Sequence, residues 1–291
     1  MELWQEYRHP KSIPEAIKEL TTSPMPVVPI AGGTDLLLDM RQGRHTPART
    51  LLDLTGIPEM NRIELQGDAL FIGACATINR IITHPLVKEK AQALVDACDL
   101  IAGHQVRNVA TLGGNVAHAL PAADGTIALV ALNATAEIAS PSGLRQVPFL
   151  DLFLGPGKSA IAKSSELITG FYIQTATPTQ ASSFNRVMIP QGVALPILNC
   201  AVWVDREGQN IKNARIAVGP GGPTPFRATD AENNLRGQKY NEGIIAQASK
   251  ALLTQGSFRT SPRRATSDYR KYILPGLFRE TFNQAWSRAY P

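Results

Sequence analysis

Apolar residues in the first part of this chain recur first at helical and then at strand spacing. The pattern predicts a helix over residues 14–20, strands at 27–30 and 49–54, and a helical turn at 36–41. Ser12 is placed to cap the first helix, whose apolar face comprises Ile13, Ile17 and Leu20. Because the two strands flank a helical turn, residues 1–55 are predicted to form a small α/β unit with a βαβ element.

Residues 56–176 have a mixed pattern. A hairpin is predicted where apolar segments at 63–65 and 69–72 flank Gln66-Gly67-Asp68. Helical spacing covers 77–82 and 88–102, an apolar helix is predicted over 126–133, and a strand pair is centred on 140–143. This section is therefore predicted to be a middle α+β unit whose strands are mostly non-parallel.

Residues 177–291 are predicted to begin with a linker, Pro178-Thr179-Gln180. The residues after it alternate between apolar and polar, as in an antiparallel hairpin. Helices are predicted over 241–254 and 268–288, with Pro275 interrupting the second. The fold class is thus α+β: the small α/β unit and the middle α+β unit are followed by a C-terminal antiparallel-sheet-and-helix domain.

Charge and cysteine usage exclude several classes of function. The chain has 291 residues with 29 basic and 24 acidic side chains, and the excess is spread along it except at Arg259 to Arg264 and Arg270-Lys271. That pattern favours a solvated face over a nucleic-acid surface, which interleaves aromatic residues with a denser basic stripe. Cys75, Cys98 and Cys200 lie far apart, so this chain is expected to hold no iron–sulfur cluster or zinc site of its own.

The first residues lack the basic and apolar regions of a signal peptide, and no apolar run approaches the roughly 20 residues of a membrane span. A cytoplasmic location is the resulting expectation.

Two glycine pairs carry most of the chemical information. One lies in Ala31-Gly32-Gly33-Thr34-Asp35 after an apolar run, and the other in Thr111-Leu112-Gly113-Gly114-Asn115. Adjacent glycines beside a hydroxyl let backbone N–H groups approach an anion that a Cβ atom would keep away. Two such loops could hold the phosphates of one dinucleotide from opposite sides, the first of them near a helix N-terminus.

Other candidate residues have two interpretations each. Asp124 precedes the apolar helix and is either its N-cap or an acceptor for sugar hydroxyls. His104 and His118 flank the second glycine pair and are interpreted as lining groups rather than bases.

Neither glycine pair forms G-x-G-x-x-G, and Gly157-Lys158-Ser159 lacks the early glycine of a Walker loop. Hydrolase and metalloprotease motifs are missing, so a bound cofactor such as a flavin would supply any redox chemistry.

At these positions the chain resembles the FAD-binding medium subunit of the molybdenum hydroxylases, the group that includes xanthine dehydrogenase and carbon monoxide dehydrogenase. The resemblance covers nearly the whole chain and is strongest in three segments, Pro29 to Leu36, Ile101 to Asn115, and Pro121-Ala122-Ala123-Asp124. It implies a two-subdomain FAD-binding fold followed by the C-terminal domain, with FAD held between the first two units.

The resemblance also implies a set of residues around FAD. Ile30 to Asp35 and Thr111 to Asn115 would surround the pyrophosphate, Ile101 would lie beside the adenine, and Asp124 on the ribityl or ribose side. Arg186 would lie near the flavin, and Ile168 would lie near the isoalloxazine or belong to the core. The complete predicted set is Pro29, Ile30, Ala31, Gly32, Gly33, Thr34, Asp35, Ile101, Ala102, Thr111, Gly113, Gly114, Asn115, His118, Ala123, Asp124, Ile168 and Arg186.

By the same resemblance, partner subunits would carry the remaining cofactors: a large subunit with molybdopterin and a small subunit with two [2Fe-2S] clusters. Electrons from xanthine, another purine or heterocycle, or an aldehyde would reach FAD and leave to NAD+ or another acceptor. The alternatives are a self-contained flavin oxidase and a flavin-free scaffold subunit. The roughly 115 residues after the second unit are few for an oxidase's own substrate domain.

Overall fold

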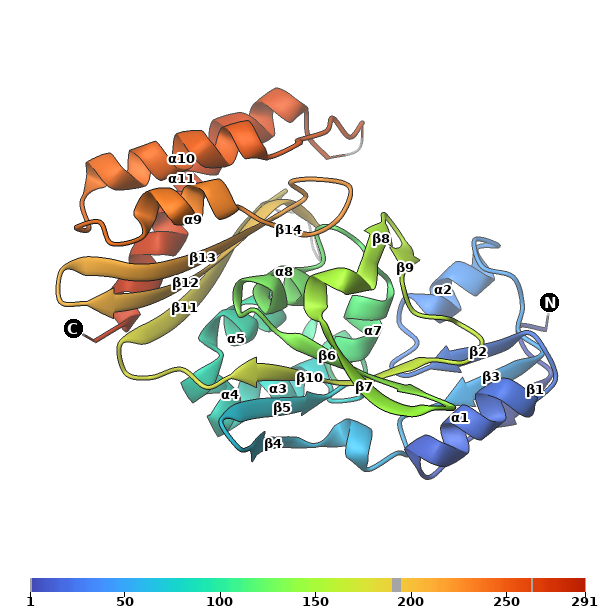
Figure 1. Ribbon diagram of the computed structural model, residues 1–291. Helices are drawn as coiled ribbons and strands as arrows, with labels where there is room; N and C mark the ends of the chain where they lie inside the picture. The colour runs from blue at the N-terminus through green and yellow to red at the C-terminus, as the bar shows by residue number, and fades with distance from the viewer. Residues whose placement is uncertain (1, 190–194, 263, 291) are drawn as a thin grey trace.

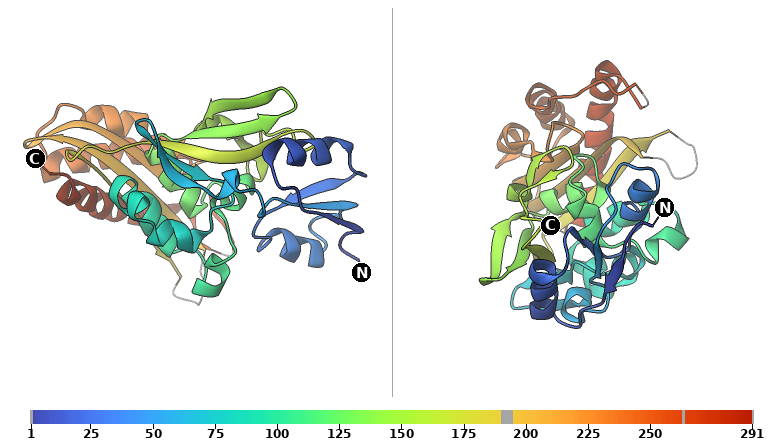
Figure 2. Two further views of the ribbon diagram at one scale, coloured as in Figure 1. Left: turned by 90° about the horizontal axis from the view of Figure 1, so that it is seen from below. Right: turned by 90° about the vertical axis from the view of Figure 1, so that its right-hand side faces the viewer.

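The computed structural model describes residues 2–189, 195–262 and 264–290. Three main sheets follow one another along an elongated molecule, with the first sheet and the C-terminal helices at opposite ends (Figures 1 and 2). Among the described residues, no helix combines the length and the apolar character needed to cross a membrane.

The first sheet is parallel and has the strand order β1-β3-β2. Its elements are β1 (Glu6–Arg8), α1 (Ile13–Thr22), β2 (Val27–Ile30), α2 (Leu36–Arg41) and β3 (Thr50–Asp53). The predicted βαβ element and the cap of α1 are confirmed, because the Ser12 hydroxyl accepts a hydrogen bond from the Glu15 N–H. Strand β1 was not predicted, since three residues are too few to establish an alternating pattern.

The second sheet is antiparallel throughout, in the order β4-β5-β10-β6-β7. Its strands are β4 (Ile63–Gln66), β5 (Ala69–Gly73), β6 (Thr135–Ser140), β7 (Gly143–Pro148) and β10 (Leu167–Gln174). A small pair, β8 (Phe153–Gly155) and β9 (Lys158–Ser159), lies beside it, and the short 3-10 helices are η1 (Glu59–Asn61) and η2 (Phe149–Leu152). Both predicted strand pairs and the non-parallel arrangement are confirmed.

Six helices accompany this sheet: α3 (Ile78–Thr83), α4 (Pro85–Lys90), α5 (Gln92–Asp99), α6 (His104–Arg107), α7 (Leu112–Ala117) and α8 (Asp124–Ala131). The prediction of continuous helical structure over 88–102 was wrong. The chain leaves the helical conformation at Ala91, and α5 ends at Asp99 before Ala102, which has a φ of 48°. The Arg107 guanidinium then donates to the carbonyls of Asp99, Ile101 and Ala102, which satisfies acceptors that the helix end leaves free.

The third sheet is antiparallel, in the order β11-β12-β13-β14. Its strands are β11 (Gln180–Met188), β12 (Pro196–Glu207), β13 (Asn210–Gly219) and β14 (Phe226–Arg227), and its helices are α9 (Thr229–Leu235), α10 (Glu242–Gln255) and α11 (Ser267–Arg288). The predicted interruption at Pro275 was wrong, because α11 runs across it. Buried Leu274 on one side and Leu277 and Phe278 on the other hold both halves against the core, which offsets the missing N–H donor.

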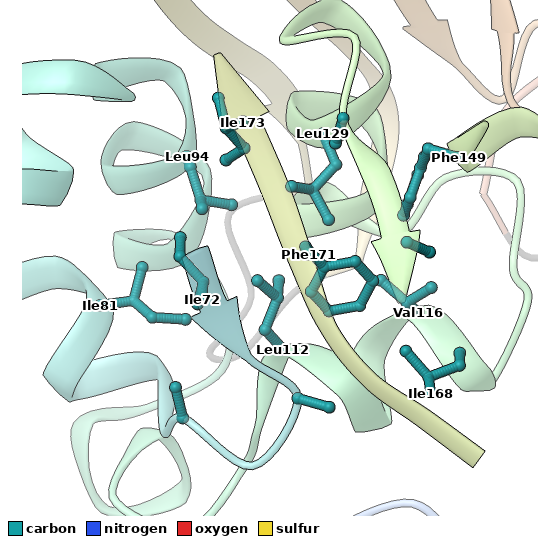
Figure 3. Packing of buried hydrophobic residues seen from close by; sticks show 14 of the residues in the cluster. Ile72, Ile81, Leu94, Leu112, Val116, Leu129, Phe149, Ile168, Phe171 and Ile173 are labelled. Carbon is teal, nitrogen blue, oxygen red and sulfur yellow. The ribbon is translucent and has the colours of Figure 1, made fainter. Parts of the chain in front are cut away.

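A single apolar cluster joins the first two sheets. It extends from Leu20 of α1 through Ile72 of β5 to Phe171 of β10. Leu112 and Val116 of α7 lie beside Phe171, so the core itself anchors α7 (Figure 3). A second cluster lies between the third sheet and its helices. The division into units at 1–55, 56–176 and 177–291 stays a prediction.

Candidate cofactor site

A cavity of about 1160 Å³ is lined by segments from all three sheets and their loops. Every residue of the set predicted from the resemblance lines this cavity, including Pro29, Ala31 and Ala123. Residues that are more than 150 positions apart in the sequence, such as Gly32 and Arg186, share its wall. The structure thus brings the whole predicted set together in one place.

The loop between β2 and α2 leaves a row of backbone donors free. Among the described residues, the N–H groups of Gly32, Gly33, Thr34 and Asp35 donate to no acceptor. Gly33 has a φ of 66°, which favours glycine. At Gly32, a Cβ atom would lie 2.1 Å from the Val109 carbonyl oxygen, so the loop packs directly on the segment before the second glycine pair. Successive free N–H groups of this kind form a concave site for an anion.

The second glycine pair is arranged differently from the prediction. Gly113 and Gly114 lie in the first turn of α7, where the Thr111 hydroxyl accepts from the Gly114 N–H. The N–H groups of Leu112 and Gly113 donate to the carbonyls of Ala76 and Ala74. These donors are therefore engaged within the protein, and the two loops do not present matching sets of free N–H groups.

The two glycines of α7 have different roles, which substitution can separate. A Cβ at Gly113 would lie 2.6 Å from the Ala74 oxygen, whereas at Gly114 the nearest atom is the Thr111 hydroxyl oxygen at 3.1 Å. We expect Gly113→Ala to lower the free energy of unfolding by about 1–3 kcal/mol through overpacking. Gly114→Ala should change it by less than about 1 kcal/mol, because helix propensity offsets the contact. Urea denaturation measures both, and equal losses would contradict this distinction.

Asp124 is not the N-cap of α8. It is the first helical residue, and Ala123 occupies the N-cap position. Its buried carboxylate instead pairs with the Arg186 guanidinium from β11 and accepts from Asn199 Nδ2 at 2.7 Å. Burial raises the pKa of Asp124, against the opposing effects of Arg186 and Asn199.

Arg186 and Asn115 both have buried polar atoms without a partner. Among the described residues, nothing hydrogen-bonds to Arg186 Nε or to Asn115 Oδ1, although both residues line the cavity. Buried polar atoms are normally satisfied by protein, water or ligand. These two atoms therefore fit a cavity whose ligand brings its own acceptor and donor groups.

The remaining predicted residues occupy the walls. Ile168 lies in β10 next to an irregularity in the strand pairing, and it belongs to the core as well as lining the cavity. His118 also lines it, with Nδ1 3.8 Å from a carboxylate oxygen of Asp35. His104 is exposed and is not part of the lining, contrary to the prediction.

Several lining residues were missed from the sequence. Arg259, Arg264 and Arg270 line the cavity, and Arg270 is only 1% exposed. The prediction of a solvated face was therefore wrong for Arg270, which donates to the Arg259 carbonyl. The sequence showed that these basic residues cluster, but it gave no sign that they are buried. Arg263, in the same run, lies outside the described residues.

Cys75 also lines the cavity, although no pattern in the sequence indicated this position. Burial raises the pKa of its thiol to about 12, and its Sγ donates to the Leu54 carbonyl. Since the thiolate is the reactive form, we expect iodoacetamide at pH 8 to modify native Cys75 roughly a thousandfold more slowly than the unfolded chain. Peptide mass spectrometry with and without urea measures the two rates. Native and unfolded rates within tenfold of each other would contradict the burial.

Comparison with known proteins places this geometry in a family. Residues 3–174 match the model of the FAD binding domain in molybdopterin dehydrogenase, and residues 183–285 match the CO dehydrogenase flavoprotein C-terminal domain. Within the described residues, no group of three or more His, Cys, Asp or Glu side chains could hold a metal ion.

Individual relatives agree with both matches over almost the full chain. A xanthine dehydrogenase FAD-binding subunit from Escherichia coli is 27% identical over 97% of this chain and 96% of its own length. The nicotine 6-hydroxylase medium subunit of Paenarthrobacter nicotinovorans is 31% identical over 97% of each. A structure of carbon monoxide dehydrogenase from Hydrogenophaga pseudoflava, which lacks the Mo-pyranopterin moiety of the molybdenum cofactor, matches with a TM-score of 0.93, 28% identity and complete coverage of both chains. The chain therefore belongs to the FAD-binding subunits of the molybdopterin dehydrogenases, a family of oxidoreductase components.

Proposed function

We propose that this chain binds one FAD in the cavity and serves as the flavin electron-transfer subunit of a molybdopterin-dependent dehydrogenase. The row of free N–H groups from Gly32 to Asp35 carries this proposal, because it offers donors to a diphosphate at the wall of a large cavity. The matched family model describes an FAD-binding domain, and FAD contains a diphosphate of this kind.

The other lining residues are assigned to the remaining parts of FAD. Ile101 and Ala102 would contact the adenine, and Thr111, Gly113, Gly114, Asn115 and His118 would lie along the diphosphate and its neighbouring sugar. Asp124 and Arg186 would face the ribityl chain and flavin, with Ile168 against the ring. Bound FAD supplies the redox chemistry, while these side chains bind it, orient it and shield it from water.

The assembly follows from the same family. We propose a large subunit with molybdopterin and a small subunit with two [2Fe-2S] clusters, which would deliver electrons to this chain. The names of the relatives, an FAD-binding subunit and a medium subunit, support a multi-subunit enzyme. The oxidised substrate, a purine, another heterocycle or an aldehyde, would bind the large subunit, and NAD+ or another acceptor would take electrons from FAD.

Location belongs to the proposal as well. The three cysteines are free and buried, which fits the reducing cytoplasm. Fractionation of cells that express the chain tests this, and recovery outside the cytoplasmic fraction would contradict it.

The cofactor assignment is tested on the chain expressed alone. After gel filtration and denaturation, released chromophore is identified by chromatography against FAD and FMN standards. We expect close to one FAD per chain and no hydroxylation of added purines. A chain that takes up no FAD even after reconstitution would support the flavin-free scaffold, and purine turnover without a molybdenum subunit would support a self-contained enzyme.

A further inference from the structure

The side chain of Arg107 contacts a short loop that forms part of the cavity wall. This loop, residues 100–103, connects Asp99 at the end of α5 to His104 at the start of α6. Within it, Ile101 and Ala102 line the cavity, whereas Arg107 does not. We refer to residues 100–103 as the α5–α6 loop. Arg107 therefore acts on the cavity wall from the side of the protein.

A single guanidinium nitrogen of Arg107 serves three backbone carbonyls of this region. Nη1 donates to the carbonyl oxygens of Asp99 at 2.8 Å, Ile101 at 3.1 Å and Ala102 at 3.0 Å. The side chain is only 15% exposed, so water competes little for these bonds. Carbonyls at a helix C-terminus lack intrahelical partners, and a cation also complements the helix dipole there. The guanidinium group therefore draws the α5–α6 loop into a tight turn at the end of α5.

Ala102 needs this support because of its backbone conformation. Its φ of 48° lies in the left-handed region, which is unfavourable for a residue with a Cβ atom. Arg107 donates both to the carbonyl of Ala102 and to that of the preceding Ile101. A strained backbone conformation persists only where the surrounding structure holds it. Loss of these bonds should therefore let Ile101 and Ala102 move within the cavity wall.

Asn79 of α3 fixes the guanidinium group on its other side. Its Oδ1 accepts from Arg107 Nε at 3.2 Å. Its Nδ2 donates to the His104 carbonyl at 3.1 Å and to Asn108 Oδ1 at 2.6 Å. Helix α3 contacts both α5 and α6, and its buried face belongs to the apolar core. Arg107 is thus held against a fixed support and cannot simply follow a displaced loop.

We propose that Arg107 is a positioning residue for the adenine end of FAD and that it thereby sets the preference of the chain for FAD over FMN. The proposal rests on the proposed function, which assigns Ile101 and Ala102 to the adenine. FMN has the flavin, the ribityl chain and a phosphate of FAD but lacks the adenylate. A change confined to the α5–α6 loop therefore weakens the binding of FAD and leaves that of FMN.

The test measures the two halves of FAD separately on the full chain freed of its cofactor. Isothermal titration calorimetry gives the Kd for FAD, and competition gives the constants for ADP and FMN. We expect Arg107→Met to raise the constants for FAD and ADP by the same factor, about 10-fold or more, because hydrogen bonds from a charged group are lost. The constant for FMN should stay nearly unchanged. Arg107→Lys should lie between, because its ammonium group can reach the carbonyls but lacks the planar fork that also bonds to Asn79.

Arg80→Met is the matched control. Arg80 Nη1 also donates to a backbone carbonyl, that of Asn61 at 2.9 Å, but Arg80 is exposed and does not line the cavity. This substitution should leave the constants for FAD, ADP and FMN unchanged.

Four outcomes decide the proposal against alternatives. A loss for FAD that exceeds the loss for ADP, or an equal loss for FMN, would show a general structural role of Arg107 and overturn the proposal. Unchanged constants in Arg107→Met would overturn it as well, as would ADP that does not displace FAD from the wild type. A wild-type chain that binds no FAD would show instead that the proposed function fails. If circular dichroism shows that Arg107→Met is unfolded, Arg107→Lys provides the same comparison.

Discussion

Replacing Gly32 by alanine is expected to lower FAD per chain at least tenfold at limiting FAD. The added Cβ would lie 2.1 Å from the Val109 oxygen and 2.8 Å from the Ala110 Cα, and both are backbone atoms that cannot swing aside. The β2–α2 loop must then move away from this segment, which disturbs the free N–H groups from Gly32 to Asp35. Loss of aligned hydrogen bonds to a charged group costs about 1.5–3 kcal/mol each, enough for this effect. Chromatography of released FAD measures the change.

Gly276→Ala is the matched control for this substitution. A Cβ at Gly276 meets no atom within 4 Å, and the residue lies in α11, away from the cavity. It should keep the wild-type FAD content, and circular dichroism should show that both variants are folded. A folded Gly32→Ala chain with full FAD content would contradict the role of the β2–α2 loop.

Replacing Arg186 by methionine is expected to lower the free energy of unfolding by about 3–5 kcal/mol. The substitution leaves the Asp124 carboxylate buried and without its cation, since the side chains of the pair are only 6% and 5% exposed. Asn199 alone then hydrogen-bonds to that carboxylate. Urea denaturation of the FAD-free chain measures the loss, and the double variant with Asp124→Leu should lose less than the sum of the two single variants.

The exposed ion pair between Arg8 and Glu6 provides the comparison for Arg186. Its side chains are 47% and 31% exposed, so Arg8→Met should leave the free energy of unfolding nearly unchanged. Similar losses for Arg186→Met and Arg8→Met would show that burial does not govern the Asp124–Arg186 pair. Since this pair joins α8 to β11, its loss should also loosen the wall of the cavity.

Local patterns predicted most elements because their causes are local. A serine before a helix, glycine at a turn and alternating apolar residues in a strand act within a few positions, so the cap of α1, the βαβ element and the hairpins follow from the sequence. The first glycine pair belongs to the same class, since Gly33 needs its positive φ within the loop itself.

Tertiary contacts decided the features that were predicted wrongly. The N–H groups at the second glycine pair are engaged within the protein: the Ala76 and Ala74 carbonyls, more than 30 residues away, accept from Leu112 and Gly113, and the Thr111 hydroxyl accepts from Gly114. The helix of α11 continues past Pro275 because buried side chains hold it on both sides.

The sequence by itself determined many of the elements, the α+β class and, through the resemblance, the residues that gather around one cavity. Only the tertiary structure decided that Asp124 pairs with Arg186 instead of capping α8, and that Arg270 is buried. The physical reason is that a residue's propensity depends on its neighbours along the chain, whereas burial and charge pairing depend on which distant segments pack against it.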